Sequence, residues 1–244
     1  MTVQSKAITL QSPFASSLVR FLTVVLMVFV VSYPAVSEAS SDKVRRPLDL
    51  PAGGGPDDED EDESIPDMIS FYGVDYEGDA FVWVLDVSLS MGGIGLIDTL
   101  RSEFTGAVSS LSRDTDFGAV AFSTNMRFLD LFCKEADSSR KSTAAAWIVS
   151  IEPGGVTCLA PAVVKGLEIV RKSPNQHRRV IVVGDGMPYC GTAGPSPSDV
   201  LSDISFNNYD RIPIDTVFVG LAPEGFEFFQ QLASQNYGRA VVSQ

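Results

Sequence analysis

The chain has 244 residues, a formal net charge of −13 and 45% hydrophobic residues. This length and apolar content are sufficient for one ordinary domain with a sizeable core and extensions. The negative charge argues against nucleic acid as a partner, because its phosphates would be repelled. The single histidine, His177, leaves little from which to build histidine-based catalysis.

The first 39 residues have the pattern of a secretory signal. Residues 1–20 contain no acid, residues 21–31 are uniformly apolar, and Pro34 and several small residues follow. This order predicts an exported protein with a cleavable signal peptide over residues 1–39. The uncharged stretch 21–37 is close to the shortest membrane span, so an uncleaved anchor that attaches the chain to a membrane is the alternative.

The next segment, residues 40–67, has the composition of a linker. It contains the stretch PAGGGP, and residues 57–63 are seven consecutive acids. Such a segment buries too little apolar surface to order itself, and its like charges repel one another. The sequence therefore predicts a disordered acidic linker, followed by a folded domain over residues 68–244.

Strand and helix patterns alternate through this domain. The acidic stretch at residues 74–79 is expected to be a turn, whereas continuous apolar runs predict buried strands and apolar residues at helical spacing predict helices. The expected strands are residues 81–85, 116–122, 126–132, 178–184, 212–220 and 239–243, and the expected helices are residues 97–111, 138–151, 159–171 and 224–238.

The connections between these elements indicate the fold class. Strands that alternate with helices predict a doubly wound α/β domain, with a mainly parallel sheet and helices on both faces. Only the residues STN separate the strands at 116–122 and 126–132, which is too short for a parallel crossover. The strand at 126–132 is therefore expected to be the one antiparallel edge strand of a six-stranded sheet.

Oxygen-bearing side chains occur where predicted strands end. In FVWVLDVSLSM, Asp86 ends the first core strand and Ser88 and Ser90 follow, Thr157 lies in a glycine-rich turn before a helix, and Asp185 ends the strand of RRVIVVGD. Ligands of open α/β sheets bind beyond the carboxyl ends of the strands. Two carboxylates and three hydroxyls are hard oxygen ligands that suit Mg²⁺ or Mn²⁺, and a cation would relieve the repulsion between the carboxylates.

The same residues carry a family resemblance. DVSLSM resembles the D-x-S-x-S signature of the von Willebrand factor type A domain, and the resemblance extends over roughly residues 70–244 through GGVT, VVGDGMP and the closing helix and strand. It implies a Rossmann-like fold with a metal-ion-dependent adhesion site, whose metal is completed by a partner's carboxylate. The positions that match this site are Asp86, Ser88, Ser90, Thr157 and Asp185.

Two further features of the sequence bear on this resemblance. The lead-in FYGVDYEGDAFVWVLD resembles that of exported bacterial members of the family. Leu89 stands where many members have glycine, and it adds bulk beside the expected metal. The sequence therefore predicts an exported, non-enzymatic module that binds a protein ligand through an Asp or Glu carboxylate.

Three alternatives stay open at this point. One is a hydrolase that acts on a phosphate or ester through Asp86 or Asp185, although the chain has no G-x-S-x-G motif and no phosphate-cradling glycine loop. Another is a metal-free structural domain. In the third, the polar residues only shape loops, with Ser88 and Ser90 in a turn and Thr157 as a helix N-cap.

The three cysteines show no zinc-binding spacing. Cys158 directly follows Thr157 and Cys190 lies five residues past Asp185, so both are expected at the metal end of the sheet. Cys133 ends the antiparallel strand and is expected at the opposite end. In an oxidising compartment the expected disulfide is Cys158–Cys190, with Cys133 unpaired.

Overall fold

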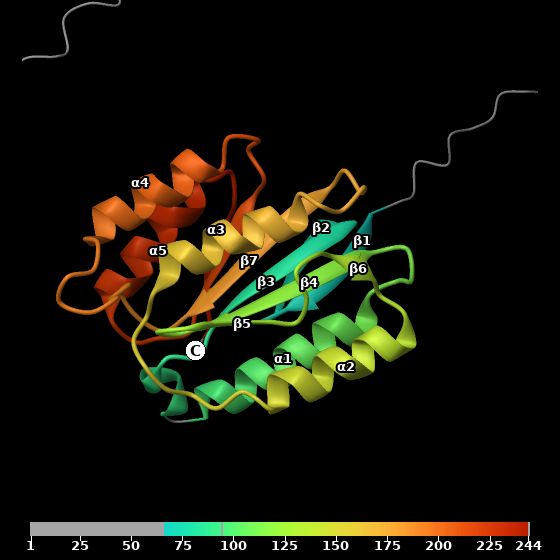
Figure 1. The fold of residues 1–244 in the computed structure, drawn as a ribbon, viewed down its shortest axis with the longest axis horizontal. Coiled ribbons are helices and arrows are strands. Elements are labelled where there is room, and N and C mark those ends of the chain that lie inside the picture. Colours follow the sequence, from blue (N-terminus) through green and yellow to red (C-terminus); the bar gives the residue numbers. More distant parts are fainter. Residues whose placement is uncertain (1–65, 94, 244) are drawn as a thin grey trace, which may run out of the picture. The chain divides into compact units, whose positions relative to one another are not determined.

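A mainly parallel sheet forms the centre of the domain in the computed structural model, which describes residues 66–93 and 95–243. Its strands lie in the order β5-β4-β3-β7-β8-β9, and β6 also pairs with β4 (Figure 1). The strands are β3 Ala80–Asp86, β4 Asp116–Phe122, β5 Met126–Phe128, β6 Lys134–Glu135, β7 Arg178–Gly184, β8 Ile214–Phe218 and β9 Ala240–Val242. The predicted signal peptide, and the predicted linker up to residue 65, lie outside the described residues.

The predicted topology of the sheet is confirmed. Strands β4, β3, β7, β8 and β9 pair in parallel, and β5 pairs antiparallel with β4 at the edge. The predicted six strands all exist, but β5 is shorter than expected and β6 is an additional strand, also antiparallel to β4. A strand of two residues such as β6 is too short to leave an alternating pattern in the sequence.

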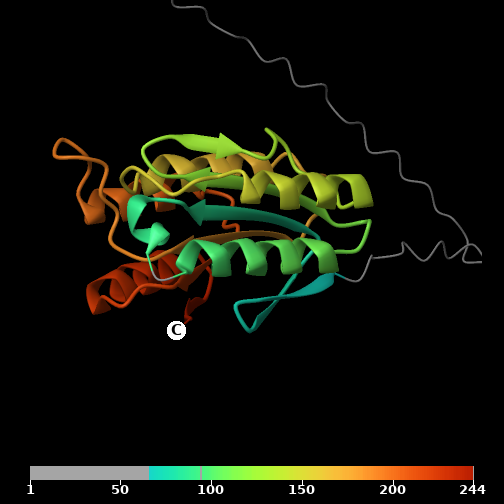
Figure 2. The same cartoon turned by 90° about the horizontal axis from the view of Figure 1, so that it is seen from below.

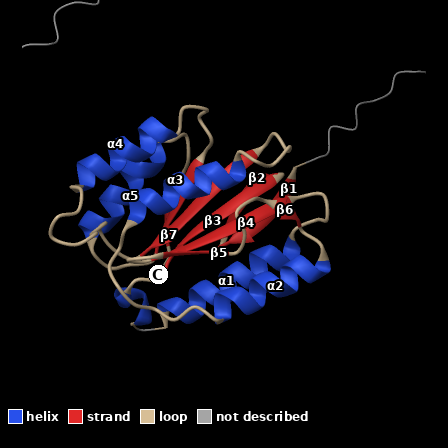
Figure 3. Cartoon of the chain, in the orientation of Figure 1, coloured by secondary structure: helices blue, strands red, loops and turns tan. Residues whose placement is uncertain are grey.

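Helices cover both faces of the sheet, as predicted (Figures 1 and 3). On one face lie α1 (Leu96–Ser110) and α2 (Ser138–Val149). On the other lie α3 (Leu159–Val170), α4 (Pro197–Asn207) and α5 (Pro223–Gln235). Sequence analysis missed α4, although its start carries a recognisable capping box between Ser196 and Asp199.

The central strand β3 explains why the sheet needs both helical layers. All seven of its residues are buried. Because successive side chains of a strand point to opposite faces, Trp83 packs with the aromatic side chains of Phe104 and Phe117 on the α1 and α2 side. Val82 and Val84 belong to the second core, on the α3 side.

A second, two-stranded antiparallel sheet precedes β3. It consists of β1 (Asp67–Phe71) and β2 (Val74–Gly78), and Figure 2 shows this hairpin beside α1. The predicted acidic turn at residues 74–79 is therefore wrong. Burial alternates along β2, so that Tyr76 is buried whereas Asp75 and Glu77 are exposed. These acids on the outer face of β2 make its sequence read as a turn.

The predicted boundary between linker and domain falls close to the start of this hairpin. Asp67, the last residue assigned to the linker, begins β1, and its Oδ2 accepts a hydrogen bond of 2.6 Å from the Ser112 N–H. Among the described residues, none of the helices has the length and apolar content needed to cross a membrane.

Candidate metal centre

The pairing of β3 with β7 brings two carboxylates to the same edge of the sheet. The strands are parallel neighbours, with Leu85 opposite Val183. Asp86 is the last residue of β3, and Asp185 directly follows the last residue of β7. Because the carboxyl ends of parallel strands meet at one edge, both acids lie at the position where open α/β sheets bind ligands.

Two serines connect these carboxylates through hydrogen bonds. The backbone N–H of Ser88 donates to Asp86 Oδ1 at 2.7 Å, and the hydroxyls of Ser88 and Ser90 lie 3.1 Å apart. The Ser90 hydroxyl in turn donates to Asp185 Oδ1 at 2.9 Å. Four of the five predicted site residues therefore form one continuous group of oxygen atoms.

Within this group, Asp86 is the most buried residue. Ser90 is exposed and Asp185 is half-buried, whereas the side chain of Asp86 is only 1% exposed. Desolvation by burial raises the pKa of Asp86 to about 7; the hydrogen bonds from Ser88 oppose this shift and the charge of Asp185 adds to it. In the absence of a counter-ion, the ionised form of Asp86 is therefore disfavoured.

One oxygen of Asp86 has no partner. Among the described residues, Asp86 Oδ2 is buried and receives no hydrogen bond. Buried polar atoms are paired in most proteins, because an unpaired one costs about 1–3 kcal/mol. A divalent cation would satisfy this atom, and the carboxylates and hydroxyls around it are the hard oxygen donors that Mg²⁺ or Mn²⁺ prefers.

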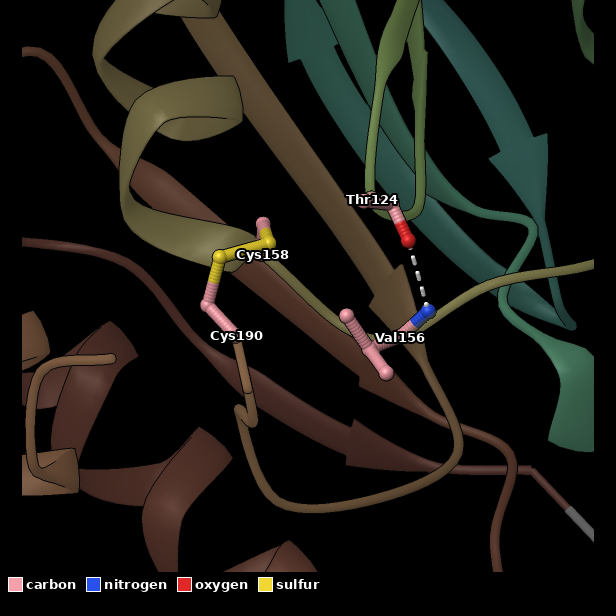
Figure 4. The surroundings of a disulfide bond; sticks show 4 residues. All are labelled: Thr124, Val156, Cys158 and Cys190. Carbon is pink, nitrogen blue, oxygen red and sulfur yellow. Dashed lines mark hydrogen bonds between the residues drawn. A yellow bond between two sulfur atoms is a disulfide. The ribbon is translucent and has the colours of Figure 1, made fainter. Parts of the chain in front are cut away.

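Thr157, the fifth predicted site residue, lies in a different loop, which precedes α3. Its backbone forms two hydrogen bonds with Tyr189, of 2.8 Å and 3.0 Å, so its loop is paired with the loop that carries Asp185. A disulfide joins Cys158 to Cys190 directly beside this pair, with a Cα–Cα distance of 4.6 Å. Figure 4 shows this bond between the start of α3 and the loop after β7.

The expected capping role is wrong for Thr157, whereas Ser88 and Ser90 do lie in a turn, as that alternative expects. The N-cap of α3 is Cys158 rather than Thr157, and no side chain caps that helix. Ser88 precedes the short 3-10 helix Leu89–Gly92, but its side chain forms no capping hydrogen bond there. The Ser88 hydroxyl lies 3.1 Å from the Ser90 hydroxyl and also beside the Asp86 carboxylate, so its oxygen belongs to the group that could bind a ligand.

Backbone contacts hold the surrounding loops together. The N–H of Leu89 donates to Gly155 O at 3.1 Å, and the N–H of Cys158 donates to Ser123 O at 3.1 Å. Gly220, after β8, lies so close to Asp185 that an added Cβ would overlap the Asp185 carbonyl. Sequence analysis missed these positioning residues, because only the folded chain brings them together.

The remaining reactive side chains lie elsewhere. Cys133 is buried near Phe81, toward the amino end of β3, as predicted, and burial raises the pKa of its thiol to about 12. His177 pairs with Asp79 at 3.0 Å, at that same end. Among the described residues, no three His, Cys, Asp or Glu side chains gather, so hydroxyls would supply part of any metal-ligand set here.

Comparisons with known proteins agree on the fold. No family model matches the chain. Inter-alpha-trypsin inhibitor heavy chain H2 of Homo sapiens is 25% identical over 166 residues, which are 65% of this chain but only 17% of that protein. The chain thus spans a small part of this relative's length.

Two solved structures are similar to the domain. A von Willebrand factor type A structure from Catenulispora acidiphila is 15% identical with a TM-score of 0.60, over 70% of this chain and 40% of that one. The vWF domain of the type V pili tip protein Mfa5 from Porphyromonas gingivalis is 12% identical with a TM-score of 0.55, over 67% and 89% of the two chains. At these identities the likeness shows a shared fold.

Proposed function

We propose that this chain, which has the fold of a von Willebrand factor type A domain, is an exported protein-binding module that uses a divalent cation. The observation that carries the proposal is the buried, unpartnered Oδ2 of Asp86, at one end of a group of hydroxyls that leads to Asp185. The proposed ligands of Mg²⁺ or Mn²⁺ are Asp86, Ser88, Ser90, Thr157 and Asp185, some of them acting through water.

The proposed ligands of the cation differ in charge and in what they fix. Asp86 and Asp185 provide the negative charges, and the three hydroxyls are neutral donors. Ser88 fixes Asp86 through its backbone N–H, while Ser90 fixes Asp185 through its hydroxyl. When bound, the cation supplies a positive centre that accepts a carboxylate oxygen of the partner.

The charge of the site makes the cation necessary for this partner. Without the cation, an approaching Asp or Glu side chain meets acidic groups, Asp185 and the partly ionised Asp86, and like charges repel one another more strongly in a partly dry site than in water. With the cation in place, the same approach gains a charge-assisted contact. Partner binding is therefore expected to require the metal.

The similar structures support an interaction role. They include the pili tip protein Mfa5 and the pilus adhesin SpaC from Lactobacillus rhamnosus GG. The proposed export also follows from the signal-like pattern of residues 1–39. Cell fractionation with N-terminal sequencing tests export: we expect a shortened chain outside the cytoplasm, and an intact amino terminus on cytoplasmic protein would contradict it.

Affinity capture tests the binding function. Immobilised wild-type protein should retain its partner from a cell-surface fraction in Mg²⁺ and release it in EDTA. Asp86→Ala should abolish retention and Ser88→Ala should weaken it less, because the first removes a charged ligand and the second a neutral one. His177→Ala, at the opposite end of the sheet, is the matched control. Retention that survives both EDTA and Asp86→Ala would show that the partner binds elsewhere.

A further inference from the structure

We propose that the partner presents its carboxylate on a protein segment in which apolar side chains flank the Asp or Glu. This inference rests on the proposed function and specifies its partner. The carrying observation is a set of three exposed apolar side chains around the oxygen cluster, here called the apolar rim. The apolar rim consists of Leu89, Tyr189 and Leu221.

The first two members of the rim lie next to ligand residues. Leu89 stands between Ser88 and Ser90 and is 72% exposed. Tyr189 is 52% exposed, and its backbone is paired with that of Thr157. The backbone N–H groups of Leu89 and Tyr189 are both hydrogen-bonded to neighbouring loops, so these side chains project from fixed positions.

The third member lies in the loop after β8. Leu221 follows Gly220, which abuts the backbone of Asp185, and is 85% exposed. Each rim residue therefore comes from a different loop and adjoins a different part of the ligand set. A single exposed leucine needs no explanation, but apolar side chains from three loops around one polar cluster are typical of a binding surface.

A small apolar hollow borders Thr157, the fifth of the proposed ligands. Its volume is about 50 Å³, enough for little more than one small group. Thr157 lies at its border, and the disulfide and prolines supply much of its wall. The wall includes Cys158, Pro161, Pro188, Cys190 and Pro195. A short aliphatic side chain next to the partner's acid fits this space better than a charged one.

The charges of the surrounding loops decide between an apolar and a polyanionic partner. The loops contain no lysine or arginine, and Glu152 and Asp185 are their only acids. A polyanion would therefore gain one contact with the cation and find no further positive charge on these loops, since Arg101, beside them, already pairs with Glu152. An acid with apolar neighbours would instead bury the rim. The loops are residues 87–93, 123–125, 152–158, 185–196 and 219–222.

Three synthetic peptides of equal length test this inference. Both termini are blocked, and the central glutamate is flanked by leucines in the first peptide, by serines in the second and by further glutamates in the third. In Mg²⁺ we expect the leucine-flanked peptide to bind at least about tenfold more tightly than the others, since one buried leucine contributes roughly that factor. Isothermal titration calorimetry measures all three affinities.

Rim variants show whether this preference comes from the proposed surface. Leu89→Ser combined with Leu221→Ser should reduce the preference to less than about threefold and leave Mg²⁺ affinity unchanged. Phe206→Ser is the matched control, because Phe206 is 83% exposed at the end of α4, far from the cluster. It should leave both affinities unchanged.

The outcomes separate this inference from the proposed function. If wild-type protein binds no Mg²⁺, the proposed function fails and the inference fails with it. If Mg²⁺ binds, the inference alone is overturned by equal affinities, by tighter binding of the polyglutamate peptide, by no binding of the leucine-flanked peptide at millimolar concentration, or by a preference that survives the rim variants. A Mg²⁺-dependent dimer that excludes the peptide would assign the rim to a second copy and also overturn it.

Discussion

Asp86 is the residue on which the candidate site depends most. One of its carboxylate oxygens is fixed by the Ser88 N–H and the other has no partner among the described residues. Its half-buried counterpart, Asp185, accepts a hydrogen bond from Ser90. The two acids thus differ in environment: Asp185 faces water, whereas Asp86 needs either a proton or a cation to remain buried.

This difference predicts how metal affinity depends on pH. Burial raises the pKa of Asp86 to about 7, so without metal the carboxyl keeps its proton below that pH. Only the ionised form binds a cation, and therefore affinity falls as pH falls through 7. We expect Mg²⁺ to bind about tenfold more weakly at pH 6 than at pH 8, as measured by calorimetry. Ser88→Ala should bind Mg²⁺ more weakly and move this fall to higher pH, because it removes a hydrogen bond that opposes the raised pKa of Asp86. An affinity independent of pH would contradict the account.

At the scale of elements, the site is an assembly of loops beyond the carboxyl ends of β3, β4, β7 and β8. The loop after β3 is hydrogen-bonded to the loop before α3, and that loop is bonded to those after β4 and β7. The loop after β8 packs against Asp185 through Gly220. We therefore expect small disturbances of one loop to be transmitted to the proposed ligands on its neighbours.

A pair of glycine substitutions tests this coupling. Gly220→Ala would force the β8 loop away from the Asp185 carbonyl, so we expect lower Mg²⁺ affinity and a loss of about 1–3 kcal/mol in unfolding free energy. Gly106→Ala is the control, because its Cβ would meet no atom within 4 Å on α1. It should raise stability by up to about 1 kcal/mol and leave Mg²⁺ affinity unchanged. Unaltered Mg²⁺ affinity in Gly220→Ala would argue against the coupling.

The disulfide should act on the same assembly. The bond between Cys158 and Cys190 joins the loops of Thr157 and Asp185, and the two cysteines are 32 positions apart in the sequence. Replacing both by serine is expected to lower the unfolding free energy by about 3 kcal/mol, as measured by urea denaturation, and to weaken Mg²⁺ binding. Cys133→Ala, at the opposite end of the sheet, should leave Mg²⁺ binding unchanged. Equal Mg²⁺ affinities for the double variant and the wild type would refute the link between the bridge and the site.

At the scale of the whole molecule, the sequence predicts the elements better than their assembly. The strands at residues 116–122 and 178–184 match β4 and β7 because their apolar runs end sharply at polar or turn residues. The hairpin β1–β2 was not predicted, since acids on its outer face mask the alternation. Short elements such as β6 leave no local pattern, and their pairing depends on distant residues.

For the candidate site too, the sequence predicts the residues better than their arrangement in space. The types of all five residues and their places at the ends of predicted elements predicted a site for a hard cation, and the family resemblance added the expectation of a partner's carboxylate. The distances could not be predicted, because they depend on β3 and β7 being neighbours although about 90 residues separate them. The same holds for the apolar rim, whose three members are ordinary loop residues until the fold brings them together.

The most direct test of the account is calorimetric titration of Mg²⁺ into the wild-type protein and into Asp86→Asn. Asparagine keeps the shape of the side chain and can still accept the Ser88 N–H, so it removes the charge while preserving the local fold; thermal unfolding of both proteins verifies this. The account predicts one Mg²⁺ per wild-type chain and at least about hundredfold weaker binding by the variant, since a charged ligand contributes several kcal/mol. No Mg²⁺ binding by the wild type, or equal binding by both proteins, would contradict it.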